Sequence, residues 1–129
     1  SMGAYHAVNF FLQHPDVFNK VIALSGVYDA RFFIGDCLDD EAIYQNSPAD
    51  YIWNQNDGWF IDRYRNADII VCTGLGAWEQ DGLPSFYTLK EAFEHKNIPA
   101  WFAEWGYDVS HDWIWWRKQM PYFLNQLNL

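Results

Sequence analysis

The chain has 129 residues and a mass of 15.3 kDa, which is the size of a single domain. Half of its residues are hydrophobic and 20% are aromatic, so the chain can build a substantial core and is not of the disordered type. Eight basic and 17 acidic residues give a formal net charge of −9, and such a surface repels phosphate backbones and anionic lipid headgroups. We therefore expect neither a nucleic-acid partner nor a membrane partner.

Motifs for metals, cofactors and export are missing from the sequence. No apolar run approaches the roughly 18 residues that a membrane span needs, and the first residues do not resemble a signal peptide. The two cysteines, Cys37 and Cys72, are too few for a disulfide framework, and Cys72 closes an apolar run as a small buried strand residue. This usage fits a reducing cytosol, so we expect a cytoplasmic protein. Without zinc-ligand spacing, a phosphate loop or a dinucleotide fingerprint, we expect no metal and no cofactor.

The periodicity of apolar residues predicts alternating helices and strands. Helices are expected at 3–14, 84–96 and 112–127. Strands are expected at 21–24, which reads as buried on both faces, at 68–73, which is also buried, and at 100–105. Residues 27–67 form an irregular, aromatic-rich insertion, with short helices near 39–46 and 58–65. This order predicts an α/β fold in one domain, 1–129, with a parallel β-sheet and flanking helices.

The first predicted helix has no strand before it. A helix that opens at Gly3 is typical of the second half of a βα unit, so either the chain is a fragment or a partner supplies the missing strand. The strand at 21–24 would then have an unpaired edge, and such edges favour pairing with another chain. We expect a homodimer, or pairing with a missing N-terminal half.

The opening residues, Ser1-Met2-Gly3-Ala4, match the second half of a nucleophile elbow. In that turn a serine between small residues projects above the sheet at the start of a helix. The next N–H, here that of Met2, lies at the helix N-terminus, where developing negative charge is stabilised. The alternative interpretation is that Ser1 is a cloning remnant and Met2 an initiator.

Two further loops follow predicted strands, at the edge of a parallel sheet where sites form. His111 lies after the third strand and before the last helix, as a general base would. Trp113, Trp115 and Trp116 follow it closely and would shield an imidazole from bulk water. The alternative is a capping or surface histidine.

The glycine-rich loop at 74–81 follows the middle strand and carries two acids. Either Glu79 or Asp81 could orient an imidazole and stabilise its protonated form. An exposed acidic loop is the alternative. With these residues the chain order is serine, acid, histidine, which is the order of α/β-hydrolases.

The segments 1–11, 14–29, 44–52, 73–81 and 110–124 together resemble the carboxyl-terminal half of an esterase family in the α/β-hydrolase superfamily, which includes esterase D and enterochelin esterases. The resemblance implies a partial α/β-hydrolase fold, with Ser1 as nucleophile, His111 as base and the acid in the turn at 79–81. Glu79 is preferred because it follows Trp78, and Asp81 is the second choice. The Met2 N–H would be one oxyanion donor, while the other belongs to an upstream loop that this sequence does not contain.

The activity implied is hydrolysis of a small-molecule carboxylic ester or thioester through an acyl-enzyme, without a cofactor. Trp78, Trp105 and Trp113 are candidates for the substrate pocket, and the insertion at 27–67 is a candidate lid, although core packing would also explain these aromatics. With half of the oxyanion hole missing, we expect weak or no turnover from the 129 residues alone. The alternative function is a non-catalytic hydrolase half that acts as an assembly or binding module.

Overall fold

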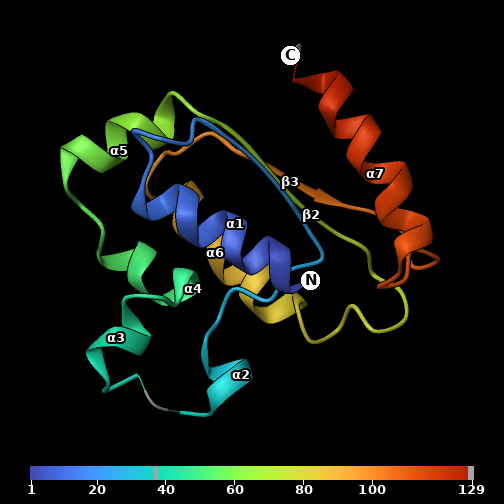
Figure 1. Ribbon diagram of the computed structural model, residues 1–129, viewed down its shortest axis with the longest axis horizontal. Coiled ribbons are helices and arrows are strands. Elements are labelled where there is room, and N and C mark those ends of the chain that lie inside the picture. The colour runs from blue at the N-terminus through green and yellow to red at the C-terminus, as the bar shows by residue number, and fades with distance from the viewer. Residues whose placement is uncertain (37, 128–129) are drawn as a thin grey trace.

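The computed structural model describes residues 1–36 and 38–127, so Cys37 lies outside the described residues (Figure 1). At its centre is a parallel sheet in the order β1 (Lys20–Leu24), β2 (Asp68–Thr73) and β3 (Trp101–Glu104). The register aligns Val21 with Ile69 and Ile70 with Trp101. The fold is therefore the predicted one, a parallel sheet with flanking helices.

Alternate residues of each strand enter two separate clusters, one on each face of the sheet. Val21 and Val71 pack into the larger cluster with residues of α1 (Met2–Gln13) and α6 (Leu83–His95). Leu24 and Cys72 pack on the opposite face against Phe123 of α7 (Trp113–Gln126). Both faces of β2 are thus buried, which explains why its sequence is a continuous apolar run.

The insertion at 27–67 is a chain of short helices that packs against both α1 and α6. Tyr28 and Tyr64 are fully buried in the larger cluster, and the Tyr64 hydroxyl donates a hydrogen bond to the Leu12 carbonyl. Core packing therefore accounts for part of its aromatic content, whereas Phe32, Phe33, Trp53 and Trp59 are exposed. Its helices are α2 (Arg31–Ile34), α3 (Glu41–Tyr44), α4 (Pro48–Tyr51), the 3₁₀ helix η1 (Ile52–Asn54) and α5 (Gly58–Arg65).

Local capping signals explain where several of these helices begin. Asp40 accepts a hydrogen bond from the Ala42 N–H at the start of α3, and Asp57 accepts one from the Trp59 N–H at the start of α5. Pro48 occupies the first turn of α4, where its missing N–H costs no helix hydrogen bond.

The predicted element boundaries agree with the structure to within about two residues, except in the insertion. The helix expected near 39–46 covers only residues 41–44, and α2, α4 and η1 were not predicted because such short helices carry too little periodicity. The outer edge of β1 pairs with no strand among the described residues. Over the same residues, no helix has the length and apolar character needed to cross a bilayer.

Candidate active site

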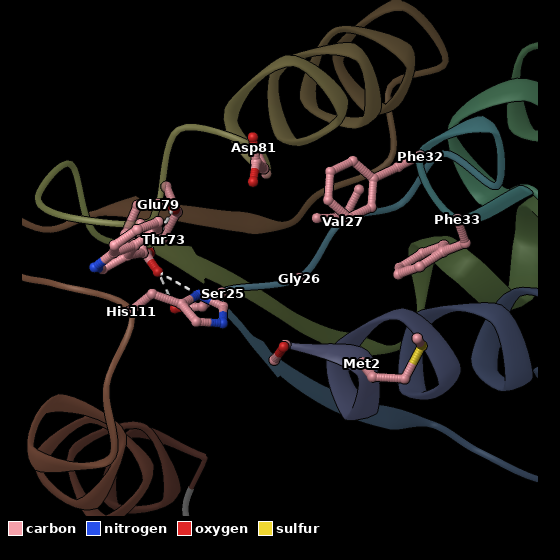
Figure 2. Close-up of a pocket in the computed structure, with 13 residues that line it drawn as sticks. Met2, Ser25, Gly26, Val27, Phe32, Phe33, Thr73, Glu79, Asp81 and His111 are labelled. Carbon is pink, nitrogen blue, oxygen red and sulfur yellow. Dashed lines mark hydrogen bonds and ion pairs between the residues drawn. The ribbon is translucent and has the colours of Figure 1, made fainter. Parts of the chain in front are cut away.

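A cavity of about 260 Å³ lies at the carboxyl ends of β1 and β2 (Figure 2). Its walls come from four parts of the chain: the start of α1, the turn after β1 with α2, the loop after β2, and the loop before α7. The residues that line it are Ser1, Met2, Ser25, Gly26, Val27, Phe32, Phe33, Thr73, Trp78, Glu79, Asp81, Gly82 and His111. The cavity therefore contains the serine, the histidine and both acids that the sequence singled out.

The loop after β2 and the loop before α7 interlock through backbone contacts. The Gly76 N–H donates to the Val109 carbonyl at 2.9 Å, and the His111 N–H donates to the Ala77 carbonyl at 2.9 Å. At Gly74 an added Cβ would lie 2.2 Å from the Val109 carbonyl oxygen, so only glycine allows this approach. The glycines of this loop thus bring the acid and the histidine together.

Glu79 and His111 form the central contact of the site. His111 Nδ1 lies 2.7 Å from Glu79 Oε1, and Figure 2 shows the two side chains side by side. The Glu79 side chain is 1% exposed and that of His111 is 27% exposed. A buried carboxylate on Nδ1 fixes the ring and leaves Nε2 as the nitrogen that can exchange a proton with a substrate group.

The second carboxylate oxygen, Glu79 Oε2, accepts hydrogen bonds from inside the protein. The Gly74 N–H donates at 2.7 Å, the Ser25 hydroxyl at 3.0 Å, and the Thr73 hydroxyl lies at 3.1 Å. A buried carboxylate without such donors would carry a large desolvation cost. These donors fix the carboxylate in the orientation that faces His111.

The imidazole is also held by an aromatic ring of α7. Trp116 packs edge-on against His111, with ring centroids 4.9 Å apart and planes at 89°, and its indole N–H donates to Ser25 Oγ at 2.9 Å. Trp113 packs in turn on Trp116 at 5.2 Å. Of the three predicted shielding tryptophans, Trp116 makes the direct contact, whereas Trp115 faces Lys118.

Ser1 and Met2 reach the cavity from the start of α1. The Ser1 carbonyl accepts the Ala4 and Tyr5 N–H groups, which makes Ser1 the N-cap residue. Its side chain makes no capping hydrogen bond, so the helix does not engage its hydroxyl. Met2 is the first residue of the helix, and the positive end of the helix dipole therefore faces the cavity.

The two acids differ in their surroundings, and the geometry favours Glu79 as the partner of His111. Asp81 lines the same cavity, but it makes no hydrogen bond or ion pair with the histidine in the described part of the chain. In Figure 2 the Asp81 side chain lies apart from the Glu79–His111 pair.

Of the predicted pocket tryptophans, only Trp78 lines the cavity. Trp105 packs between the sheet and α7, and Trp113 borders a groove beside β1.

Phe32 and Phe33 of α2 form an apolar wall that was not predicted individually. Both rings are partly exposed, and Phe33 packs edge-on against Tyr5 of α1 at 5.5 Å. The sequence indicated only that the insertion is aromatic. Ser25 was also missed as a site residue, although its position at the end of a buried strand placed it at the correct edge of the sheet.

The described residues give little support for a cysteine nucleophile or for a metal site. Cys72 is 1% exposed, and its burial raises the pKa of the thiol to about 12, so it is not a second nucleophile near neutral pH. Among residues 1–36 and 38–127, no cluster of three or more His, Cys, Asp and Glu side chains could hold a metal ion.

Comparison with known proteins gives one family. A family model described as "Putative esterase" matches residues 1–127. No curated protein matches the sequence. A solved ferulic acid esterase matches with a TM-score of 0.73 and 22% identity, covering 96% of this chain and 47% of its own. An S-formylglutathione hydrolase from Staphylococcus aureus matches with a TM-score of 0.62 and 21% identity, covering 98% of this chain and 51% of its own. The chain thus spans about half the length of these similar structures.

Proposed function

The chain belongs to the esterase family of the α/β-hydrolase superfamily, and from this premise we propose that it carries the Ser-His-acid triad of a carboxylic-ester or thioester hydrolase. Ser1 is the nucleophile, His111 the general base and Glu79 the acid. The 2.7 Å contact between His111 Nδ1 and Glu79 Oε1, in a cavity that Ser1 also lines, is the single observation that carries the proposal.

In the proposed reaction, Ser1 Oγ attacks the carbonyl carbon while His111 Nε2 accepts the hydroxyl proton. The new O–C bond makes a tetrahedral oxyanion. When the bond to the leaving group breaks, His111 returns its proton to the departing alkoxide or thiolate. Water then attacks the acyl-enzyme with the same base, releasing the acid and restoring Ser1. Glu79 holds the ring and stabilises its protonated form.

The oxyanion is stabilised by the start of α1. The Met2 N–H belongs to the first turn of a 12-residue helix, where backbone N–H groups favour developing negative charge. By the family resemblance, a second donor comes from a loop that precedes the elbow in a longer protein. Loss of one oxyanion donor costs about 10²–10³ in turnover, so we expect the 129 residues alone to react slowly.

The direct test replaces Ser1 by alanine in the natural full-length polypeptide that carries these residues. We expect the turnover of an aryl ester to fall by at least about 10⁴-fold, because the nucleophile is gone. Ser110→Ala is the matched control, since Ser110 lies beside His111 without lining the cavity. An unchanged rate in the Ser1 variant would refute the proposal.

Homodimerisation stays a prediction, either through the edge of β1 that pairs with no strand among the described residues or through the surface that a missing N-terminal half would cover. An apolar groove of about 660 Å³ lies beside this edge, with Ile22, Leu24 and Met120 among its residues. Sedimentation velocity tests the prediction, which requires a species of twice the monomer mass at high concentration; a monomer throughout would contradict it.

A further inference from the structure

We propose that Ser25 is a positioning residue of the active site, whose hydroxyl holds the carboxylate of Glu79 in the orientation that contacts His111 Nδ1. The inference rests on the proposed function for its catalytic consequence. Ser25 is 6% exposed and lies directly after β1, at the floor of the cavity. It touches no reacting atom in the proposed mechanism, so its effect must pass through the residues it contacts.

The direction of each hydrogen bond at Ser25 is fixed by chemistry. An indole N–H can only donate, so Ser25 Oγ accepts from Trp116 Nε1 at 2.9 Å. The single hydroxyl proton of Ser25 is then directed to Glu79 Oε2 at 3.0 Å. The chain from Trp116 through Ser25 to Glu79 therefore has one orientation.

Thr73 cannot replace this interaction. Its hydroxyl lies 3.1 Å from Glu79 Oε2 but also 2.8 Å from the Gly74 carbonyl, and its one proton serves only one of the two acceptors at a time. Among the donors described around Glu79, Ser25 is thus the side chain whose proton has no second acceptor. The Gly74 N–H is the other fixed donor, but it belongs to the same loop as Glu79.

Ser25 also joins the two groups that hold His111. Glu79 binds Nδ1 of the imidazole, and Trp116 packs edge-on against its ring at 4.9 Å. The Ser25 hydroxyl contacts both of them, so it couples the loop after β2 to α7. Without it the carboxylate can rotate and the indole loses its acceptor, and both changes loosen the imidazole.

The backbone of Ser25 adds an independent indication. Its φ is +55°, in the left-handed region that is unfavourable for a residue with a Cβ. Glycine would fit the conformation better, yet the position carries a hydroxyl. Strained residues of this kind concentrate at functional sites, where the surroundings hold them in place.

The test compares Ser25→Ala, Ser25→Gly and Ser47→Ala in the natural full-length polypeptide. Ser25→Gly removes the hydroxyl while relieving the backbone, so the pair of Ser25 variants separates the side chain from the strain. Ser47 is the matched control because it is also buried, accepts an N–H (that of Ala30) and donates to a carboxylate (that of Asp50). Turnover of an aryl ester and the NMR resonance of the His111 Nδ1 proton are measured for each protein.

We expect both Ser25 variants to lose about tenfold in kcat with KM changed by less than about twofold, since one hydrogen bond to a charged group is removed away from the substrate. The Nδ1 proton resonance should move upfield or broaden in both variants. Ser47→Ala should leave kcat and the resonance unchanged. The inference would be overturned if both Ser25 variants kept the wild-type kcat and Nδ1 resonance. It would also be overturned if kcat fell in Ser25→Ala but returned to the wild-type value in Ser25→Gly.

Two further measurements keep the inference separate from the proposed function. If Ser1→Ala retains full activity, the proposed nucleophile is wrong, but the Nδ1 resonance still reports whether Ser25 orders the Glu79–His111 pair. If neither Ser25 variant folds, Trp116→Phe keeps a six-membered aromatic ring beside His111 and removes the indole N–H donor to Ser25 together with the five-membered ring. We then expect about threefold lower kcat and a shifted Nδ1 resonance, and an unchanged resonance would count against the inference.

Discussion

The two halves of the candidate site are held by different forces. The acid–imidazole half, made of Glu79, His111, Ser25, Thr73 and Trp116, is a closed hydrogen-bond network around a carboxylate that is 1% exposed. The serine half, made of Ser1, Met2, Phe32 and Phe33, is exposed and is positioned by the packing of α1 and α2. One half is therefore held by its own hydrogen bonds, whereas the other depends on the surfaces that surround it.

This difference shows which part of the proposed chemistry is set up by contacts among the described residues themselves. A base that must accept and return a proton needs one tautomer and one ring orientation, and buried hydrogen bonds supply both. In the proposed function a nucleophile and an acyl pocket must contact substrate, and the side chains of the serine half are accordingly exposed. The following predictions use substitutions in the natural full-length polypeptide to test whether the two halves differ in this way.

The largest effect is expected from the base. His111→Ala should lower the turnover of an aryl ester by at least about 10⁴-fold, because His111 is the proposed base and, among the described residues, the one imidazole that lines the cavity. His95→Ala is the control, since His95 lies on α6 against Trp53 and outside the cavity. Equal rates for wild type and His111→Ala would remove the acid–imidazole half from the mechanism.

The next effect distinguishes the two acids. Glu79→Gln keeps the shape of the side chain and loses the charge that holds the imidazole, so kcat should fall by about 10³–10⁴-fold. Asp81→Asn should change kcat by less than about threefold, because Asp81 does not contact His111. Steady-state kinetics measures kcat for both variants, and a larger loss of kcat in Asp81→Asn than in Glu79→Gln would make Asp81 the acid.

The third prediction concerns the loop contact that builds the acid–imidazole half. Gly74→Ala places a Cβ 2.2 Å from the Val109 carbonyl oxygen, so we expect the free energy of unfolding to fall by about 1–3 kcal/mol. Gly3→Ala, in the serine half, meets no atom within 4 Å and should raise it by about 0.5–1 kcal/mol because alanine favours the helix. Urea denaturation measures the free energy of unfolding of both variants. Equal changes would mean that the loop after β2 and the loop before α7 do not interlock as described.

The smallest effect concerns Cys72, which lies beneath the acid–imidazole half. Its pKa is raised by burial from an ordinary value of 9.0 to about 12, so iodoacetamide should leave it unmodified at pH 8 in the native protein and alkylate it in denaturant. Because the folded state holds this proton more tightly, its contribution to stability is present below pH 9 and is lost as the pH rises towards 12. Peptide mapping by mass spectrometry measures the alkylation, and rapid native labelling would show that this region opens.

The sequence predicted the sheet and the long helices because each has a strong pattern of its own. The buried runs of β1 and β2 and the apolar stripe of α6 are local signals, so their positions could be predicted closely. The candidate Ser1 followed from the start of a nucleophile elbow, His111 from the rule that parallel strands end at one edge, and the preference for Glu79 from the family resemblance. All three line the same cavity in the structure.

The network around these candidates could not be predicted, because its contacts join residues that are far apart in the chain. Ser25 meets Glu79 across 54 positions and Trp116 across 91, and no local pattern encodes either pair. The residues by themselves left Glu79 and Asp81 open, because the choice between them depends on the course of one glycine-rich loop. The wall formed by Phe32 and Phe33 rests on a four-residue helix, which is too short to leave a periodic signal.

The central claim is that Ser1 is a nucleophile activated by the Glu79–His111 pair. A fluorophosphonate probe, which phosphonylates activated serines, followed by peptide mass spectrometry tests it most directly. We predict a single phosphonyl adduct on the peptide that contains Ser1, absent in Ser1→Ala and strongly reduced in His111→Ala. An adduct on a different serine, or labelling of Ser1 that is unaffected by the loss of His111, would contradict the account.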